Sequence, residues 1–74
     1  MAEKTLDLRG LKCPLPALRA GKALAGMQPG DLLIVACTDP FAAIDIPNLA
    51  RETGNTLEGS TRNNNVMTFR IGKR

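Results

Sequence analysis

Cys13 is the residue of this sequence best suited to chemistry. It follows Gly10, which ends a predicted strand, and directly precedes Pro14, so we expect it at the N-terminal cap of a helix. The positive end of that helix and the cations Arg9 and Lys12 would lower the pKa of the thiol from about 8.5 toward 7. A thiol of low pKa is also a good leaving group when another thiol attacks a sulfur attached to it. The pattern favours a group that both receives and releases sulfur.

Cys37 is the other cysteine, and its setting predicts a different role. It ends the apolar run Leu32–Cys37, which favours packing in the core. The alternative is a second thiol that resolves a persulfide or forms a disulfide, if its Cα atom lies within about 7 Å of that of Cys13. Without any His and without Cys-x-x-Cys spacing, the sequence argues against Cys/His catalysis, thioredoxin-like redox work and a tetrahedral zinc site. We therefore expect no metal and no cofactor.

Length and composition predict one small folded domain. The 74 residues suffice for a single core, so we expect one domain over residues 1–74. Hydrophobic residues make up 43% and charged residues 23%, values typical of globular proteins. The first residues lack the apolar core of a signal peptide, and the longest apolar run, six residues, is far short of a membrane span. We expect a cytoplasmic protein with reduced thiols and no membrane association.

Positive charge is concentrated in the first third of the chain. The net charge is +3, but Leu8–Gly30 contains Arg9, Lys12, Arg19 and Lys22 and no acid. Such a patch attracts phosphate or an acidic protein surface, so for Arg19 and Lys22 partner docking and simple solvation are equally open. Two Phe and no Trp or Tyr leave little to stack on unpaired bases, which makes nucleic-acid binding the weaker interpretation.

The elements that must position these residues can be read from periodicity and turn residues. Their order is strand, helix, strand, helix, strand, strand, and 74 residues with two helices can cover only one face of a sheet. We therefore predict an α/β two-layer sandwich whose first two strands are parallel, with both helices starting at one rim. The strands are expected at Thr5–Leu8, Asp31–Cys37, Asn55–Thr61 and Val66–Ile71, and the helices from Pro14 to Ala25 and from Pro40 to Gly54.

The first predicted helix has an apolar face with a basic margin. Pro14 is expected at the first helical position, and Leu15, Leu18 and Leu24 on the face that packs against the sheet. Gly21 lies on the same face, which suggests close approach to the sheet.

The second predicted helix is interrupted by a proline. Thr38 or Asp39 is expected to cap it, and Phe41, Ile44, Leu49 and Ala50 are candidate apolar positions. Pro47 removes one internal hydrogen bond and should kink the helix or split it near residue 45. Asp45, like Asp39, is interpreted as a cap.

The segment from Leu6 to Pro16, with Cys-Pro-x-Pro after a Leu-Asp-x-x-Gly-Leu strand and turn, resembles the TusA (SirA-like) family of sulfur carrier proteins. Asp39-Pro40 and Asp45-Ile46-Pro47 extend the resemblance over nearly the whole chain. It implies a four-stranded mixed sheet with two helices. It also implies that Cys13 carries a persulfide from a donor protein, such as a cysteine desulfurase or rhodanese, to an acceptor protein. In the family, acceptors serve tRNA thiolation, molybdenum cofactor maturation or sulfur oxidation.

The expected site is therefore a single nucleophile on a supporting loop. The loop residues are Arg9, Gly10, Lys12, Pro14 and Pro16, the two prolines stiffening it or merely starting the helix. The chain can be termed a protein-to-protein sulfurtransferase, since nothing in it predicts a pocket for a small substrate, and a monomer is expected. The alternatives are a nucleic-acid-binding module and a regulatory interaction domain with an incidental cysteine.

Overall fold

The predicted order of strands and helices is confirmed by the structure, a computed structural model that describes residues 2–74. The chain runs through β1 (Glu3–Leu8), α1 (Leu15–Ala25), β2 (Leu32–Cys37), α2 (Ala42–Glu52), β3 (Thr56–Asn63) and β4 (Val66–Gly72). The second helix is thus two residues shorter at each end than its sequence signals predicted.

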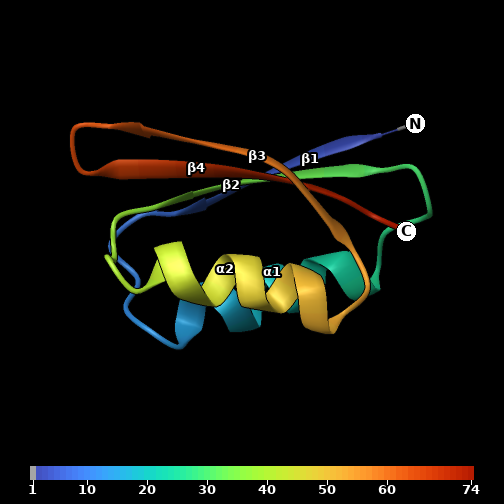
Figure 1. The fold of residues 1–74 in the computed structure, drawn as a ribbon, viewed down its shortest axis with the longest axis horizontal. Helices are drawn as coiled ribbons and strands as arrows, with labels where there is room; N and C mark the ends of the chain where they lie inside the picture. Colours follow the sequence, from blue (N-terminus) through green and yellow to red (C-terminus); the bar gives the residue numbers. More distant parts are fainter. Residues whose placement is uncertain (1) are drawn as a thin grey trace.

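The four strands form one mixed sheet in the order β1-β2-β4-β3. Strands β1 and β2 are parallel, as predicted, and the other neighbouring pairs are antiparallel. Both helices lie against the same face of the sheet and leave the opposite face open, so the two-layer sandwich is confirmed (Figure 1). The loops that precede α1 and α2 lie at one end of the molecule, and both termini lie at the other (Figure 1). The longest dimension is 30 Å.

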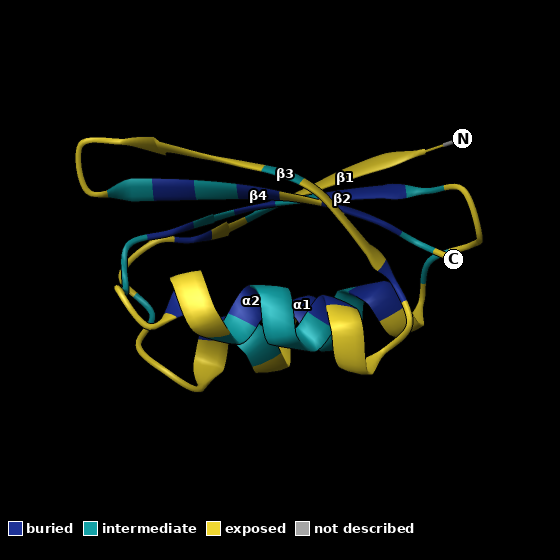
Figure 2. Cartoon of the chain, in the orientation of Figure 1, coloured by how far each residue is buried: buried dark blue, intermediate teal, exposed yellow. Residues whose placement is uncertain are grey.

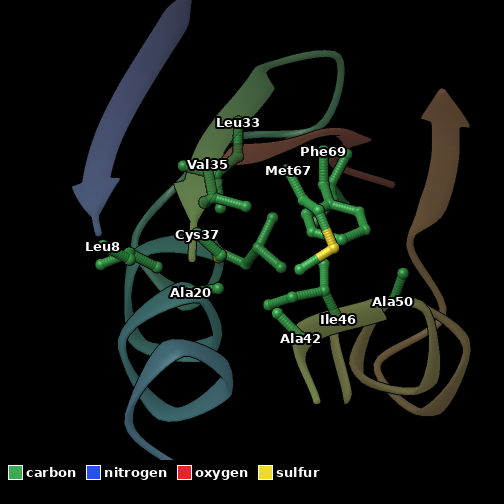
Figure 3. Close-up of a cluster of buried hydrophobic side chains, with 12 residues drawn as sticks. Leu8, Ala20, Leu33, Val35, Cys37, Ala42, Ile46, Ala50, Met67 and Phe69 are labelled. Atoms are coloured by element: carbon green, nitrogen blue, oxygen red, sulfur yellow. The ribbon is translucent and has the colours of Figure 1, made fainter. Parts of the chain in front are cut away.

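The core lies between the helices and the inner face of the sheet. The fully buried Leu33, Val35 and Cys37 alternate along β2, and Met67, Phe69 and Ile71 alternate opposite them along β4, the other central strand. The helices contribute stripes spaced four residues apart, which lie on one side of a helix. These stripes are Pro16, Ala20 and Leu24 in α1, and Ala42, Ile46 and Ala50 in α2. Figure 2 shows buried parts in both helices, and Figure 3 shows Ala20, Ala42, Ile46 and Ala50 among the core side chains.

The helix faces that pack on the sheet agree with the predicted ones only in part: Leu24 of α1 and Ala50 of α2 are buried as expected. Leu15 and Leu18 of α1 and Phe41 and Ile44 near the start of α2 were expected in the core, yet all four are exposed. The stripes that face the sheet are built around alanines, which let the helices approach it closely. That orientation turns the larger apolar side chains at the start of each helix toward solvent.

Two further predictions concern the interior of the helices. Of the kink or split predicted at Pro47, the split does not occur: α2 runs unbroken from Ala42 to Glu52, with the buried Ile46 and Ala50 on either side of the proline. Gly21 does make a close approach, but to the other helix. A Cβ atom on Gly21 would lie 3.4 Å from Cδ1 of Leu49 in α2.

Candidate functional site

The loop that carries Cys13 is joined to the loop before α2. The Gly10 N–H donates to Oγ1 of Thr38 at 2.8 Å, and the Cys13 N–H donates to Oδ2 of Asp39. The other oxygen of Asp39, Oδ1, accepts the Phe41 N–H at 3.1 Å, so one carboxylate holds both segments. The parallel pairing of β1 with β2 brings the ends of these strands to one rim, as predicted.

A tight turn leads from β1 to Cys13. Gly10 has a φ of 84°, a conformation that favours glycine, and the Leu11 N–H donates to the Leu8 carbonyl at 3.2 Å. Helix α1 begins at Leu15, and Pro14 is its N-cap rather than its first helical residue. Cys13 therefore precedes the cap, and the prediction that it occupies the cap is wrong.

Cys13 is exposed, and its thiol donates a hydrogen bond from Sγ to Oδ2 of Asp45 at 2.9 Å. This bond stabilises the protonated thiol, because a thiolate would face the carboxylate with like charge. The pKa of Cys13 is accordingly raised, first by the hydrogen bond to Asp45, then by desolvation and by the charges of Asp45 and Asp39. The predicted lowering of this pKa is wrong, because the sequence argument counted the cations near Cys13 in the chain and missed two carboxylates.

The cation Arg9 is already paired. Its Nε and Nη2 atoms donate to Oδ1 and Oδ2 of Asp7 at 2.8 and 2.9 Å. The hydrogen bonds from Arg9 lower the pKa of Asp7 to about 2. Arg9 therefore does not serve as the free positive neighbour of Cys13 that the sequence predicted. Lys12 is exposed and next to Cys13 in the chain.

Asp39 and Asp45 are the site residues that sequence reasoning missed. Both were interpreted as helix caps. Instead, Asp39 accepts a hydrogen bond from the backbone N–H of Cys13, 26 positions earlier, and Asp45 accepts one from the Cys13 thiol, 32 positions earlier. Neither helix has a side-chain cap. The available signal was the pair of acidic residues, each close to a proline, in the segments that carry the family resemblance. That signal contains no information on which group each carboxylate contacts.

Exposed apolar side chains lie at the same end of the molecule as Cys13. Leu15 follows Cys13 by two residues and is 44% exposed, and Leu18 is 62% exposed. On the facing helix, Phe41 lies next to the Asp39 carboxylate and Ile44 precedes Asp45; they are 60% and 59% exposed. We call these four residues the apolar rim. The first turns of both helices appear as exposed segments at one end of the molecule (Figure 2).

The basic residues of α1 lie on a different surface. Arg19 and Lys22 are exposed and, with Lys4 of β1, line a groove of about 460 Å³ between the edge strand and the helix. Its floor is apolar and includes Leu6 and Met27. The groove combines three cations and one carboxylate, that of Asp31, with an apolar surface, and this excess of positive charge suits an acidic protein segment.

Cys37 is a core residue. Its side chain is fully buried among the residues of the core (Figure 3), and burial raises its pKa to about 11. Both cysteines are free thiols. The packing interpretation of Cys37 therefore agrees with its position, and burial leaves its thiol unavailable to a partner protein.

Neither a metal cluster nor a membrane-spanning helix is present in the part of the chain that the structure describes. Within residues 2–74, no group of three or more Cys, Asp or Glu side chains is arranged to hold a metal ion. In the same part of the chain, no helix has the length and apolar character to cross a membrane.

Comparison with known proteins gives consistent matches. The profile of the family Sulfurtransferase TusA matches residues 4–73. A Neisseria meningitidis serogroup A protein with the name "putative sulfur carrier protein" is 50% identical over 69 residues, 93% of each chain. The sulfur carrier protein TusA of Allochromatium vinosum is 42% identical over 71 residues, 96% of this chain and 93% of that one. The crystal structure of a SirA-like protein from Desulfitobacterium hafniense matches with a TM-score of 0.82 and 28% identity, covering 97% of this chain and 96% of that one.

Proposed function

Because this chain belongs to the TusA family of sulfur carrier proteins, we propose that it carries sulfur as a persulfide on Cys13 between a donor protein and an acceptor protein. The observation that supports this most directly is the exposure of Cys13 at the end of a fixed loop, beside the apolar rim. A buried or freely moving thiol would not offer one sulfur atom to two different proteins in a defined position.

The proposed transfer conserves atoms and electrons. The Cys13 thiol loses its proton to water, and the thiolate attacks the outer sulfur of a persulfide on the donor's cysteine. A new S–S bond forms on Cys13, the donor's S–S bond breaks, and the donor's thiolate takes up a proton from water. The acceptor then repeats the step by attacking the outer sulfur on Cys13. There is no net oxidation, so no redox cofactor is required.

We further propose two surfaces for partner recognition. The apolar rim is the surface that a donor or acceptor covers when it reaches Cys13, since association removes apolar side chains from water. Arg19 and Lys22 extend the contact to an acidic segment of the partner through the groove that they line. Donors of the cysteine desulfurase or rhodanese class fit this scheme. The acceptors proposed are those that serve tRNA thiolation, molybdenum cofactor maturation or sulfur oxidation.

The test of the proposed function is persulfide loading followed by intact-mass spectrometry. After incubation with a cysteine desulfurase and free cysteine, the protein should gain the mass of one sulfur atom, and a reducing agent should remove it. Cys13→Ser should gain nothing, whereas the control Cys37→Ala should load like the natural sequence. Loading of Cys13→Ser, or loss of loading only in Cys37→Ala, would contradict the assignment of Cys13. The absence of loading in the unaltered protein would favour an incidental cysteine.

A further inference from the structure

The charged groups near the Cys13 sulfur do not match a constitutively reactive thiol. In the two loops and the first helical turns, the cations are Arg9 and Lys12 and the anions are Asp39 and Asp45. Arg9 forms an ion pair with Asp7, and the Cys13 thiol donates a hydrogen bond to the Asp45 carboxylate at 2.9 Å. The group in direct contact with the reacting atom is therefore negative.

The contact is built by the fold rather than by a neighbour in sequence. Asp45 lies in the first turn of α2, 32 residues after Cys13, and is only partly exposed. The Asp39 carboxylate fixes the Cys13 backbone to the same end of α2, so the thiol is held where Asp45 can accept its hydrogen bond. A side chain needed only as a helix cap would bond to backbone N–H groups, and α2 has no side-chain cap.

We propose that Asp45 keeps the Cys13 thiol protonated in the free carrier and selects partners that bring a positive charge to it. This inference rests on the proposed function and adds the chemistry by which a partner is recognised. A Lys or Arg side chain of the donor or acceptor pairs with the Asp45 carboxylate and removes its like-charge penalty on the thiolate. The thiol proton then leaves to water, and the thiolate attacks the outer sulfur of the incoming persulfide. In the absence of a partner, the exposed sulfur reacts slowly with other electrophiles.

The proposal can be tested on the isolated protein with small reagents. In a Cys37→Ala background, the rates of modification at pH 7 are measured with iodoacetamide, which is neutral, cystamine, which is cationic, and dithiodiglycolate, which is anionic. Each disulfide reaction replaces one S–S bond by another and releases one small thiolate. Each rate is divided by that of the same protein unfolded in urea, which removes intrinsic differences between the reagents. Asp45→Asn is compared with Glu52→Gln, a charge removal at the far end of the same helix.

Removing the Asp45 charge should speed the modification of Cys13 and weaken its preference for a cationic reagent. Asp45→Asn should react with iodoacetamide about threefold or more faster than the background protein, and its pH profile should move to lower pH. The background protein should prefer cystamine to dithiodiglycolate by about threefold or more at low salt, less at high salt, and Asp45→Asn should lose most of this preference. Glu52→Gln should change neither property. NMR spectra that match the background protein would confirm that Asp45→Asn is folded, and Asp45→Ser provides a second neutral variant.

An unchanged or slower reaction in both Asp45 variants would overturn the proposal, as would equal normalised rates with the two charged disulfides. These readouts need no desulfurase, so they are independent of whether Cys13 accepts a persulfide. Loading of Cys13 in the mass experiment without any effect of Asp45 would leave the carrier function standing and remove only the selection by charge.

Discussion

Single side chains set the local charge around Cys13, and the pair of Arg9 with Asp7 removes one cation from it. The two side chains are largely exposed, and two parallel N–H···O bonds at 2.8 and 2.9 Å join them. Such a bidentate pair has a fixed geometry even on the surface. Its value here is electrostatic, since an unpaired Arg9 would leave a free positive charge four residues before the thiol.

Asp7 should titrate at an unusually low pH. Its carboxyl pKa of about 2 lies below the usual value because Arg9 donates hydrogen bonds to the ionised form. NMR titration should therefore show a midpoint near pH 2 for Asp7, and Arg9→Gln should raise it toward the ordinary value of about 3.9. Since the folded pKa is depressed, the stabilising contribution is complete above about pH 4 and is lost as the pH falls toward 2.

Lys12→Gln is the matched control, because it removes an exposed cation from the same loop without touching Asp7. An Asp7 midpoint that stays near 2 in Arg9→Gln would show that another group lowers it.

At the scale of secondary-structure elements, α2 contains a proline that costs stability. Pro47 has no N–H to donate to the carbonyl of Ala43, four residues earlier, and an interior proline costs about 3 kcal/mol relative to alanine. Pro47→Ala should therefore raise the free energy of unfolding by about 1–2 kcal/mol after some loss of packing by the partly buried ring. Urea denaturation measures the change.

The same substitution at Pro29 should have the opposite sign. Pro29 is exposed in the turn before β2, where the Asp31 N–H donates to the Gln28 carbonyl at 3.0 Å. Here proline only restricts the unfolded chain, so Pro29→Ala should lower the free energy of unfolding by about 0.5–1 kcal/mol. If Pro47→Ala also destabilises the protein, the packing of the proline ring outweighs the missing hydrogen bond.

The positions of the strands and helices were easier to predict from the sequence than the side of each helix that packs on the sheet. Strands were identified from alternating or continuous apolar runs, and turns from Gly and Pro, because these signals are local. Which side of α1 faces the sheet is not local. A helical wheel groups Leu15, Leu18 and Leu24 by hydropathy, whereas close packing selects Pro16 and Ala20 with Leu24.

Only the local features of the candidate site were predictable from the sequence. Cys13 and its exposure follow from a strand end, a glycine and a proline that are neighbours in the chain. The thiol's contact with Asp45 depends on the parallel pairing of β1 with β2 and on how α2 is rotated about its axis. The sequence does not indicate that rotation. It therefore predicted a lowered pKa for Cys13, whereas the pKa is raised.

At the scale of the whole molecule, one end carries the thiol and the apolar rim, and this arrangement gives a prediction about sulfur transfer. Leu18→Glu should slow desulfurase-dependent loading by about tenfold, because a charge in the core of an interface must be desolvated when the partner binds. Leu57→Glu is the control, since Leu57 is 36% exposed and lies in β3, an edge strand at the other side of the sheet from β1.

The readout separates docking from chemistry. At high salt, where the charges of exposed side chains are screened, both variants should react with iodoacetamide at the rate of the unaltered protein, because neither residue contacts Cys13 or Asp45. Equal loading rates for Leu18→Glu and Leu57→Glu would show that the partner does not cover the apolar rim.

Both chain ends lie at one end of the molecule, and both helices start toward the opposite end of its 30 Å long axis (Figure 1). An affinity tag, a fluorophore or a fused domain attached at either end therefore projects away from the sulfur. Immobilisation through such an attachment should leave the reactive extremity facing solution, so a tethered carrier could still be charged and discharged by proteins that diffuse to it.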